Sequence, residues 1–176
     1  MKSHDVSVFV DTSVLVYAYS TTDPDKGEIA REVLRISGGW ISTQVLSEFS
    51  NVVLRKLVMP QREIAEAVRQ LAETRRVLTV QIEQVVAALE LSRRYRHGYY
   101  DSLIIASALA SGATTLYSED LHHGQTIEGI LRIVSPFAPA VRQPGGTYRA
   151  RRSAPVVSNL TSASAARRSR TPFSLK

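Results

Sequence analysis

A chain of 176 residues, 44% of them hydrophobic, is long enough to bury the core of one ordinary domain with residues to spare. It has no cysteine, which excludes disulfides, thiolate metal ligands and a cysteine nucleophile, so any bound metal would be held by oxygen or imidazole. Such ligands favour hard cations such as Mg²⁺ or Mn²⁺. No stretch approaches the roughly 18 apolar residues of a membrane span, and we expect a cytoplasmic protein with no membrane partner.

The net charge of +6 is unevenly distributed along the chain. Residues 139–176 hold eight Lys and Arg and no acid, so this segment carries +8, while the other 14 basic and 16 acidic residues leave the rest at −2. The basicity therefore belongs to the C-terminal segment. It gives no support for nucleic-acid binding by the remainder of the chain.

The N-terminal part alternates short β-type runs with helical patterns. The apolar run Val6–Val10 ends at Asp11 and predicts a strand buried on both faces. Thr12 and Ser13 can cap a short helix over Val14–Tyr19. The patterns that follow predict a helix from Pro24 to about Ile36, stopped by Gly38-Gly39, and then a strand at Trp40–Ser42.

The same alternation continues through the middle of the chain. Apolar spacing predicts a helix from Thr43 to about Leu57 with Glu48 at the edge of its buried face. The further elements are a helix from Pro60 to about Arg75, a strand at Val77–Val80, a helix from Ile82 to about Arg96, a nearly uncharged helix from Asp101 to Gly112, and strands at Thr114–Tyr117 and Leu131–Val134.

Strands separated by helices predict an α/β fold, a three-layer α/β/α sandwich with a mainly parallel central sheet. Ligands of such sheets bind beyond the carboxyl ends of the strands. Asp11 and Asp120 each follow a strand, while Glu48 and Asp101 lie near helix starts, so all four acids can reach the same rim.

The composition changes after Pro136, where Pro, Gly, Ser, Ala and Arg become frequent. We therefore expect one domain over residues 1–137 and a basic tail over residues 138–176, with too little apolar content to offset the entropy of ordering it. The role of this tail is left open by the sequence.

Taken singly, each of the four acids has an ordinary explanation; Asp11, Asp101 and Asp120, for example, could each cap a helix. Together they indicate a metal site, because we expect Asp11 and Asp101 to be embedded in apolar surroundings, where an unpaired carboxylate is unfavourable. Two carboxylates about 4 Å apart repel by roughly 4 kcal/mol at an effective dielectric constant of 20, so four cannot converge without a cation. A divalent cation activates a bound water and stabilises negative charge on a phosphate, and these are the requirements of phosphodiester hydrolysis.

Four segments carry a resemblance to a known family: VFVDTSVLVYAYS, ISTQVLSEFSNV, GYYDSLIIASALASGA and TTLYSEDLHHGQ, in this order. Together they resemble the PIN-domain family, specifically the VapC-type toxin ribonucleases of bacterial toxin–antitoxin pairs, over about Val6 to Phe137. The resemblance implies a PIN-like fold and a magnesium-dependent endoribonuclease that cleaves RNA with a metal-activated water, with Mn²⁺ as a substitute. It also implies a homodimer and a cognate antitoxin protein that inhibits the toxin.

Carried over residue by residue, the resemblance assigns the catalytic and metal-binding acids to Asp11, Glu48, Asp101 and Asp120, with Asp11 and Asp101 as the direct ligands. Ser13 matches the small hydroxyl residue that the family has beside its site. Glu119 is the alternative to Asp120 for the fourth acid, because the two are adjacent.

Two other functions are compatible with parts of this pattern. A phosphatase of the haloacid-dehalogenase type also has a strand ending in Asp, but it needs a second acid two residues later, where this chain has Ser13. A non-catalytic RNA-binding or scaffold protein on the same fold would use the acids structurally and bind RNA without cleaving it. The sequence leaves open which RNA is cleaved, which protein is the antitoxin, and whether one or two metals bind.

Overall fold

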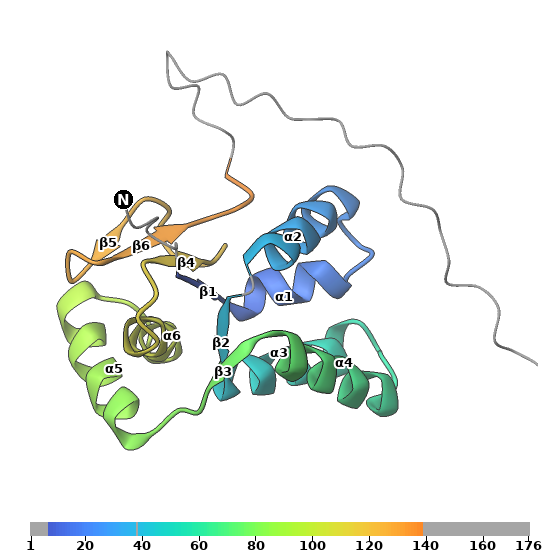
Figure 1. The fold of residues 1–176 in the computed structure, drawn as a ribbon, viewed down its shortest axis with the longest axis horizontal. Coiled ribbons are helices and arrows are strands. Elements are labelled where there is room, and N and C mark those ends of the chain that lie inside the picture. Colours follow the sequence, from blue (N-terminus) through green and yellow to red (C-terminus); the bar gives the residue numbers. More distant parts are fainter. Residues whose placement is uncertain (1–6, 38, 139–176) are drawn as a thin grey trace, which may run out of the picture. The chain divides into compact units, whose positions relative to one another are not determined.

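A computed structural model describes residues 7–37 and 39–138, so the predicted tail from residue 139 onward lies outside the described residues. The described chain forms one mixed sheet with helices packed against it (Figure 1). The strands are β1 (Val8–Val10), β2 (Trp40–Ser42), β3 (Arg76–Leu78), β4 (Thr115–Tyr117), β5 (Thr126–Ile127) and β6 (Leu131–Val134). The helices are α1 (Thr12–Tyr19), α2 (Pro24–Ser37), α3 (Thr43–Lys56), α4 (Gln61–Thr74), α5 (Ile82–Tyr95) and α6 (Tyr99–Ala110).

The strand order β3-β2-β1-β4-β6-β5 places the first strand in the interior of the sheet. All pairings are parallel except that of β5 with β6. Helices α1 to α4 lie on one side of the sheet and α5 and α6 on the other (Figure 1). The predicted α/β sandwich with a mainly parallel sheet is therefore confirmed. The direction of winding reverses between β1 and β4, and open α/β sheets bind ligands beyond the carboxyl ends of the strands at such a point.

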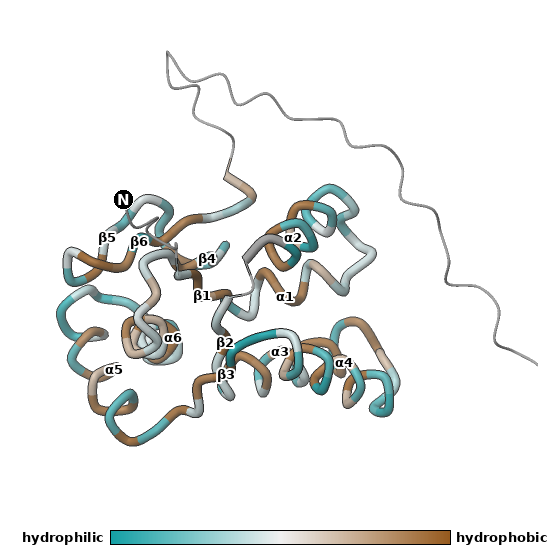
Figure 2. Tube along the Cα trace, viewed as in Figure 1, coloured by the Kyte–Doolittle hydropathy of each residue, from teal (hydrophilic) through white to brown (hydrophobic). Residues whose placement is uncertain are grey.

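The core lies on both faces of the sheet, against α6 on one side and against α1 and α3 on the other. All three residues of β1 are buried, and so is every residue of α6 from Ser102 to Ala108, which explains why this helix is almost uncharged. Helices α4 and α5, in contrast, alternate hydrophobic and hydrophilic residues along their length, as expected of helices with one face in water (Figure 2). Each large apolar side chain that is fully buried contributes about 1.5–3 kcal/mol relative to an exposed one.

Gly39 sits at a close contact between backbone segments before β2. A Cβ atom at this position would lie 2.7 Å from the carbonyl oxygen of Val8, which belongs to the neighbouring strand β1. Because backbone atoms cannot move aside as a flexible side chain can, only glycine fits here.

Some element boundaries differ from the sequence-based predictions. Helix α1 begins at Thr12 and its N-cap is Asp11, not Thr12 or Ser13, and α6 begins at Tyr99, two residues before Asp101. Strand β5 was not predicted, because two residues are too few for a periodic pattern. It is held against β6 by a tight connection in which Glu128 and Gly129 have φ values of 50° and 69°.

Within the described ranges, none of the helices is both long enough and apolar enough to cross a membrane.

Candidate active site

Asp11 lies at the carboxyl end of β1, at the point where the winding of the sheet reverses. Its backbone is extended, with φ −79° and ψ 160°, and its N–H donates to the carbonyl of Tyr117, which continues the pairing of β1 with β4. Its side-chain Oδ1 accepts a hydrogen bond of 2.6 Å from the backbone N–H of Thr12. One residue therefore ends a strand and starts a helix, and its carboxylate is held in a fixed direction.

Two serine hydroxyls bind the other oxygen of this carboxylate. Ser118 Oγ, fully buried after β4, donates to Asp11 Oδ2 at 2.6 Å, and Ser13 Oγ donates to the same atom at 3.2 Å. Ser118 Oγ also accepts from the backbone N–H groups of Asp120 and Leu121, at 3.2 and 3.3 Å. Ser118 thus joins Asp11 to the loop that carries Asp120.

Burial raises the pKa of Asp11 from 3.8 to about 6. The hydrogen bonds from Ser118 and Thr12 oppose this shift in pKa, whereas the charge of Asp120 adds to it. Among the described residues, no Lys or Arg forms an ion pair with Asp11. A buried carboxylate with only hydroxyl and amide donors around it is electrostatically suited to a cation.

Glu48 is placed beside Asp11 by α3 and is held at both carboxylate oxygens. Its Oε2 accepts from Thr12 Oγ1 at 3.0 Å, and its Oε1 accepts from Gln44 Nε2 at 2.7 Å. Gln44 Nε2 also donates to the carbonyl of Tyr100, at the start of α6, at 3.1 Å. Gln44 therefore ties Glu48 to the helix that carries Asp101.

Asp101 and Asp120 complete the acidic rim, and both are exposed. The expectation that Asp101 is embedded in apolar surroundings is wrong. Asp101 lies in the first turn of α6, where Tyr100 and Asp101 are exposed, whereas the residues from Ser102 to Ala108 are buried. Partial burial, then the charges of Glu119 and Asp101, raise the pKa of Asp120, so its carboxylate is electrostatically coupled to Asp101 as well as to Asp11.

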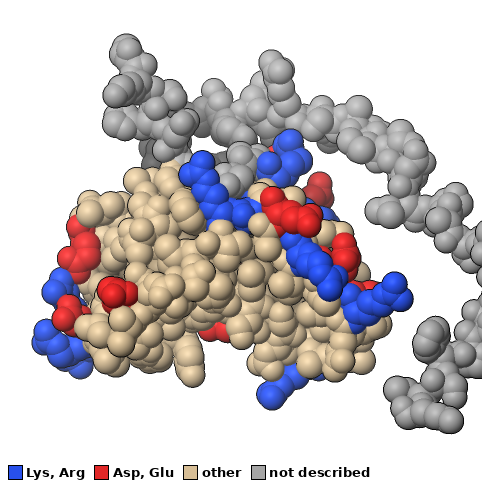
Figure 3. Space-filling model, turned by 60° about the horizontal axis from the view of Figure 1, so that its bottom comes forward, with Lys and Arg blue, Asp and Glu red and all other residues tan. Residues whose placement is uncertain are grey.

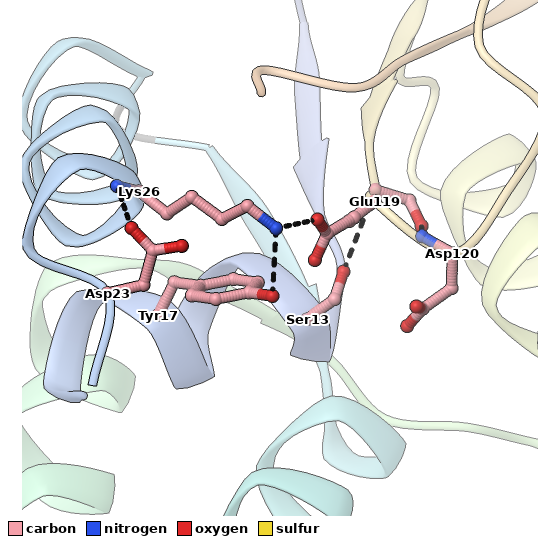
Figure 4. Close-up of polar contacts among 7 residues, drawn as sticks. Ser13, Tyr17, Asp23, Lys26, Glu119 and Asp120 are labelled. Carbon is pink, nitrogen blue, oxygen red and sulfur yellow. Dashed lines mark hydrogen bonds and ion pairs between the residues drawn. The ribbon is translucent and has the colours of Figure 1, made fainter. Parts of the chain in front are cut away.

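The adjacent acids Glu119 and Asp120 have different environments. Glu119 forms an ion pair with Lys26 of α2, while the side chain of Asp120 points in a different direction, away from Lys26 (Figure 4). This difference favours Asp120 as the acid that faces Asp11 and Asp101.

The four predicted site residues surround one rim but do not touch one another directly. Asp11 is linked to Glu48 through Thr12, and to the Asp120 loop through Ser118. Within residues 7–37 and 39–138, no three His, Asp or Glu side chains lie close enough to form a metal-binding group as they stand. The carboxylates of the four acids offer only oxygen ligands, which are the ligands that Mg²⁺ and Mn²⁺ prefer.

Sequence reasoning missed three residues that organise this rim: Ser118, Gln44 and Lys26. Ser118 carried a readable signal, because it directly follows a strand and precedes two acids. Gln44 and Lys26 lie on helices at positions that look like ordinary exposed or half-exposed faces. Only the fold shows what their side chains reach.

The surface of the described domain does not carry a continuous basic patch on the face shown in Figure 3. Lys and Arg side chains there are interspersed with Asp and Glu, and uncharged residues occupy the area between them (Figure 3). This agrees with the charge distribution in the sequence, in which the basic excess lies in residues 139–176.

Comparison with known proteins gives a family and a fold. The family model for the PIN domain matches residues 8–126. No curated protein matches the chain.

Among solved structures, VapC20 of Mycobacterium tuberculosis, described as a sarcin-ricin loop cleaving toxin, is 23% identical, with a TM-score of 0.54 over 62% of this chain and 87% of that one. A toxin–antitoxin complex from Klebsiella pneumoniae is 17% identical, with a TM-score of 0.57 over 74% and 98% of the two chains. FitAcB from Neisseria gonorrhoeae is 12% identical, with a TM-score of 0.54 over 75% and 99%. At these identities the likeness establishes the fold alone.

Proposed function

Since the chain belongs to the PIN-domain family, we propose that it is a Mg²⁺- or Mn²⁺-dependent endoribonuclease that acts in the cytoplasm as the toxin of a toxin–antitoxin pair. The observation that carries this proposal is the environment of Asp11. A buried carboxylate at the switch point of the sheet, held by Ser118 and Thr12 and coupled to Asp120, is a costly arrangement for a residue that only caps a helix.

In this proposal Asp11 and Asp101 hold the cation directly, and Glu48 and Asp120 complete its surroundings. When bound, Mg²⁺ or Mn²⁺ supplies positive charge that lowers the pKa of water and stabilises negative charge on a phosphate. Thr12 and Gln44 fix the two oxygens of Glu48, so this carboxylate is oriented to accept a hydrogen bond from the attacking water. Asp120, exposed and with a raised pKa, is placed to accept a proton at its carboxylate.

The test uses the full chain with a structured RNA, in Mg²⁺, in Mn²⁺ and in EDTA. Cleavage should require the divalent cation and should fall by at least about a hundredfold in Asp11→Asn, because the buried carboxylate is lost. Glu73→Gln, an exposed acid of α4 changed in the same way, is the matched control and should cleave as the wild type does. Cleavage that continues undiminished in Asp11→Asn would contradict the proposal, and RNA binding without cleavage in any divalent cation would instead support a non-catalytic RNA-binding protein.

The proposal of an antitoxin partner is supported by structures that share the fold. One of the structures that share the fold is a toxin–antitoxin complex from Klebsiella pneumoniae, and another is DNA-bound VapBC from Salmonella typhimurium. We expect this chain to bind a small protein encoded beside its own gene, and co-expression of the two should abolish RNA cleavage. A neighbouring gene product that neither binds the chain nor inhibits it would argue against a toxin.

The homodimer is supported by the outer face of α5. Ile82, Val86 and Leu89 are 72%, 53% and 58% exposed and lie one helical turn apart. Antiparallel packing of this face on a second copy would place Val86 against Leu89 of the partner, and acidic Glu83 near basic Arg93 at the opposite end of the partner helix. Light scattering should give a dimer mass that Val86→Glu reduces to the monomer mass, whereas Glu73→Gln should leave it unchanged.

A further inference from the structure

Lys26 is held at the edge of the acidic rim by several contacts. Its backbone N–H donates to Asp23 Oδ1 at 3.0 Å in the first turn of α2. Its Nζ forms an ion pair with the carboxylate of Glu119 and donates to the hydroxyl of Tyr17 at 3.1 Å (Figure 4). The side chains of Lys26 and Glu119 are only 31% and 27% exposed, so water screens this pair less than an exposed one.

Two aromatic rings fix the ammonium group further. Nζ of Lys26 lies 4.6 Å from the ring centroid of Tyr17 and 5.4 Å from that of Phe137. The two rings pack edge-to-face, with centroids 4.9 Å apart. Cation–π attraction from both rings holds the ammonium where it meets Glu119.

The loop on which Glu119 and Asp120 lie is anchored at its backbone by two serines. The N–H of Glu119 donates to Ser13 Oγ at 3.2 Å, and the N–H of Asp120 donates to Ser118 Oγ at 3.2 Å. Both serines also bind Asp11. The backbone position of the two acids is thus set by the site itself, whereas the direction of the Glu119 side chain is set by Lys26, away from the carboxylate of Asp120 (Figure 4).

We propose that Lys26 is a positioning residue that keeps Glu119 out of the acidic site, so that Asp120 alone of the two adjacent acids faces Asp11 and Asp101. Without the ion pair, Glu119 would be free to turn toward the rim, where its carboxylate would compete with that of Asp120 for a cation. This inference rests on the proposed function, because it names which carboxylate the metal site uses.

The test measures Mn²⁺ binding to the full chain by isothermal titration calorimetry. Asp120→Asn should weaken binding by about tenfold, as expected when one carboxylate around a metal is lost. Adding Lys26→Met to Asp120→Asn releases Glu119 to take the vacant place, and should recover at least about threefold of the loss. Adding Glu119→Gln as a third change should remove that recovery.

Two matched variants exclude a general charge effect, and a third controls for a folding defect. Lys56 is another cation whose charge lowers the pKa of Asp120. Lys56→Met removes this charge but leaves the ion pair of Lys26 with Glu119 in place. Added to Asp120→Asn, it should therefore give no recovery of Mn²⁺ binding that depends on Glu119. Lys26→Arg keeps the ion pair and should also give none. Lys26→Gln removes the same ion pair as Lys26→Met and is measured beside it. If the melting temperature shows that one of the two variants folds poorly, the other decides the result.

The outcomes separate the two proposals. If the wild-type protein does not bind Mn²⁺, or if Asp11→Asn binds it equally well, the proposed metal-dependent function is wrong. The positioning role of Lys26 is then wrong as well. If wild-type binding depends on Asp11 but the recovery is missing, or if it persists with Glu119→Gln, only the positioning role is overturned. Recovery that requires Glu119 and appears solely when the ion pair is removed supports it.

Discussion

Ser118 Oγ donates a 2.6 Å hydrogen bond to Asp11 Oδ2 across 107 positions of sequence. This bond joins the carboxyl ends of β1 and β4, the two strands between which the sheet reverses its winding. Ser118 Oγ also links Asp11 to the loop of Asp120, because the same hydroxyl accepts a hydrogen bond from the backbone N–H of Asp120. The acidic rim is therefore organised around a serine and not around the acids alone.

Ser118→Ala should lower the free energy of unfolding by about 2 kcal/mol, because it leaves a buried carboxylate and two backbone N–H groups without one of their partners. Urea unfolding of the full chain measures this change. Ser107→Ala is the control: Ser107 is also fully buried, but its hydroxyl donates only to the carbonyl of Leu103 within α6, and its loss should cost less than about 0.5 kcal/mol. Equal losses in the two variants would contradict the structural role of Ser118.

The pKa of Asp11 makes the stability of the metal-free protein depend on pH. A pKa of about 6 in the folded state lies above 3.8, so the folded state binds the proton more tightly. The resulting stabilisation is complete below pH 3.8 and is lost as the pH rises through 6. From pH 5 to pH 7 the protein should therefore lose about 1 kcal/mol of stability through Asp11.

Thermal unfolding in EDTA at pH 5 and pH 7 measures this loss. Asp11→Asn should reduce the difference between the two pH values by about 1 kcal/mol, because asparagine does not titrate. Glu73→Gln should leave the difference as it is in the wild type. If Asp11→Asn also leaves the stability difference between pH 5 and pH 7 unchanged, Asp11 does not titrate in this range.

Addition of Mg²⁺ or Mn²⁺ at pH 7 should stabilise the protein. A cation at 100 times its dissociation constant adds about 2.7 kcal/mol, which for a domain of this size raises the melting temperature by several degrees. Asp11→Asn and Asp101→Asn should each remove most of this shift, while Glu73→Gln should retain it. A shift of equal size in all four proteins would mean that the cation binds elsewhere.

Gln44→Glu should reduce RNA cleavage by about tenfold, equivalent to about 1.4 kcal/mol of transition-state stabilisation. The change removes the donor to Glu48 and to the carbonyl of Tyr100, and places a second carboxylate beside Glu48. Initial rates at saturating RNA and Mg²⁺ measure the effect. Gln70→Glu, the same change on the exposed face of α4, should leave the rate unchanged, and a comparable loss there would show that added negative charge anywhere is sufficient.

Much of the fold could be predicted because its signals are local. The apolar run that ends at Asp11 gave a buried strand, and the uncharged pattern after Asp101 gave a buried helix. Where strands and helices alternate, few topologies other than a parallel sheet are possible. Helix boundaries and the short strand β5 were harder to predict from the sequence, because helix caps and two-residue strand pairings depend on contacts with residues elsewhere in the chain.

The site was predictable as a set of acids but not as a geometry. The exposure of Asp101 depends on how the first turn of α6 lies against the rest of the domain, and periodicity cannot report this. The partner of Glu119 is Lys26, 93 positions away, so no local pattern could separate Glu119 from Asp120. The four acids as catalytic and metal ligands stay a prediction, as does the role of the tail beyond residue 138.

The interior position of β1 sets an order of events during protein synthesis. Strand β1 is made early, but its neighbour β4 and the loop with Ser118 and Asp120 are made more than 100 residues later. Until residue 120 has left the ribosome, Asp11 has neither its serine partner nor the loop acid, and the rim cannot assemble. If the chain is the ribonuclease proposed above, this delay would keep the nascent chain inactive on the ribosome that is making it.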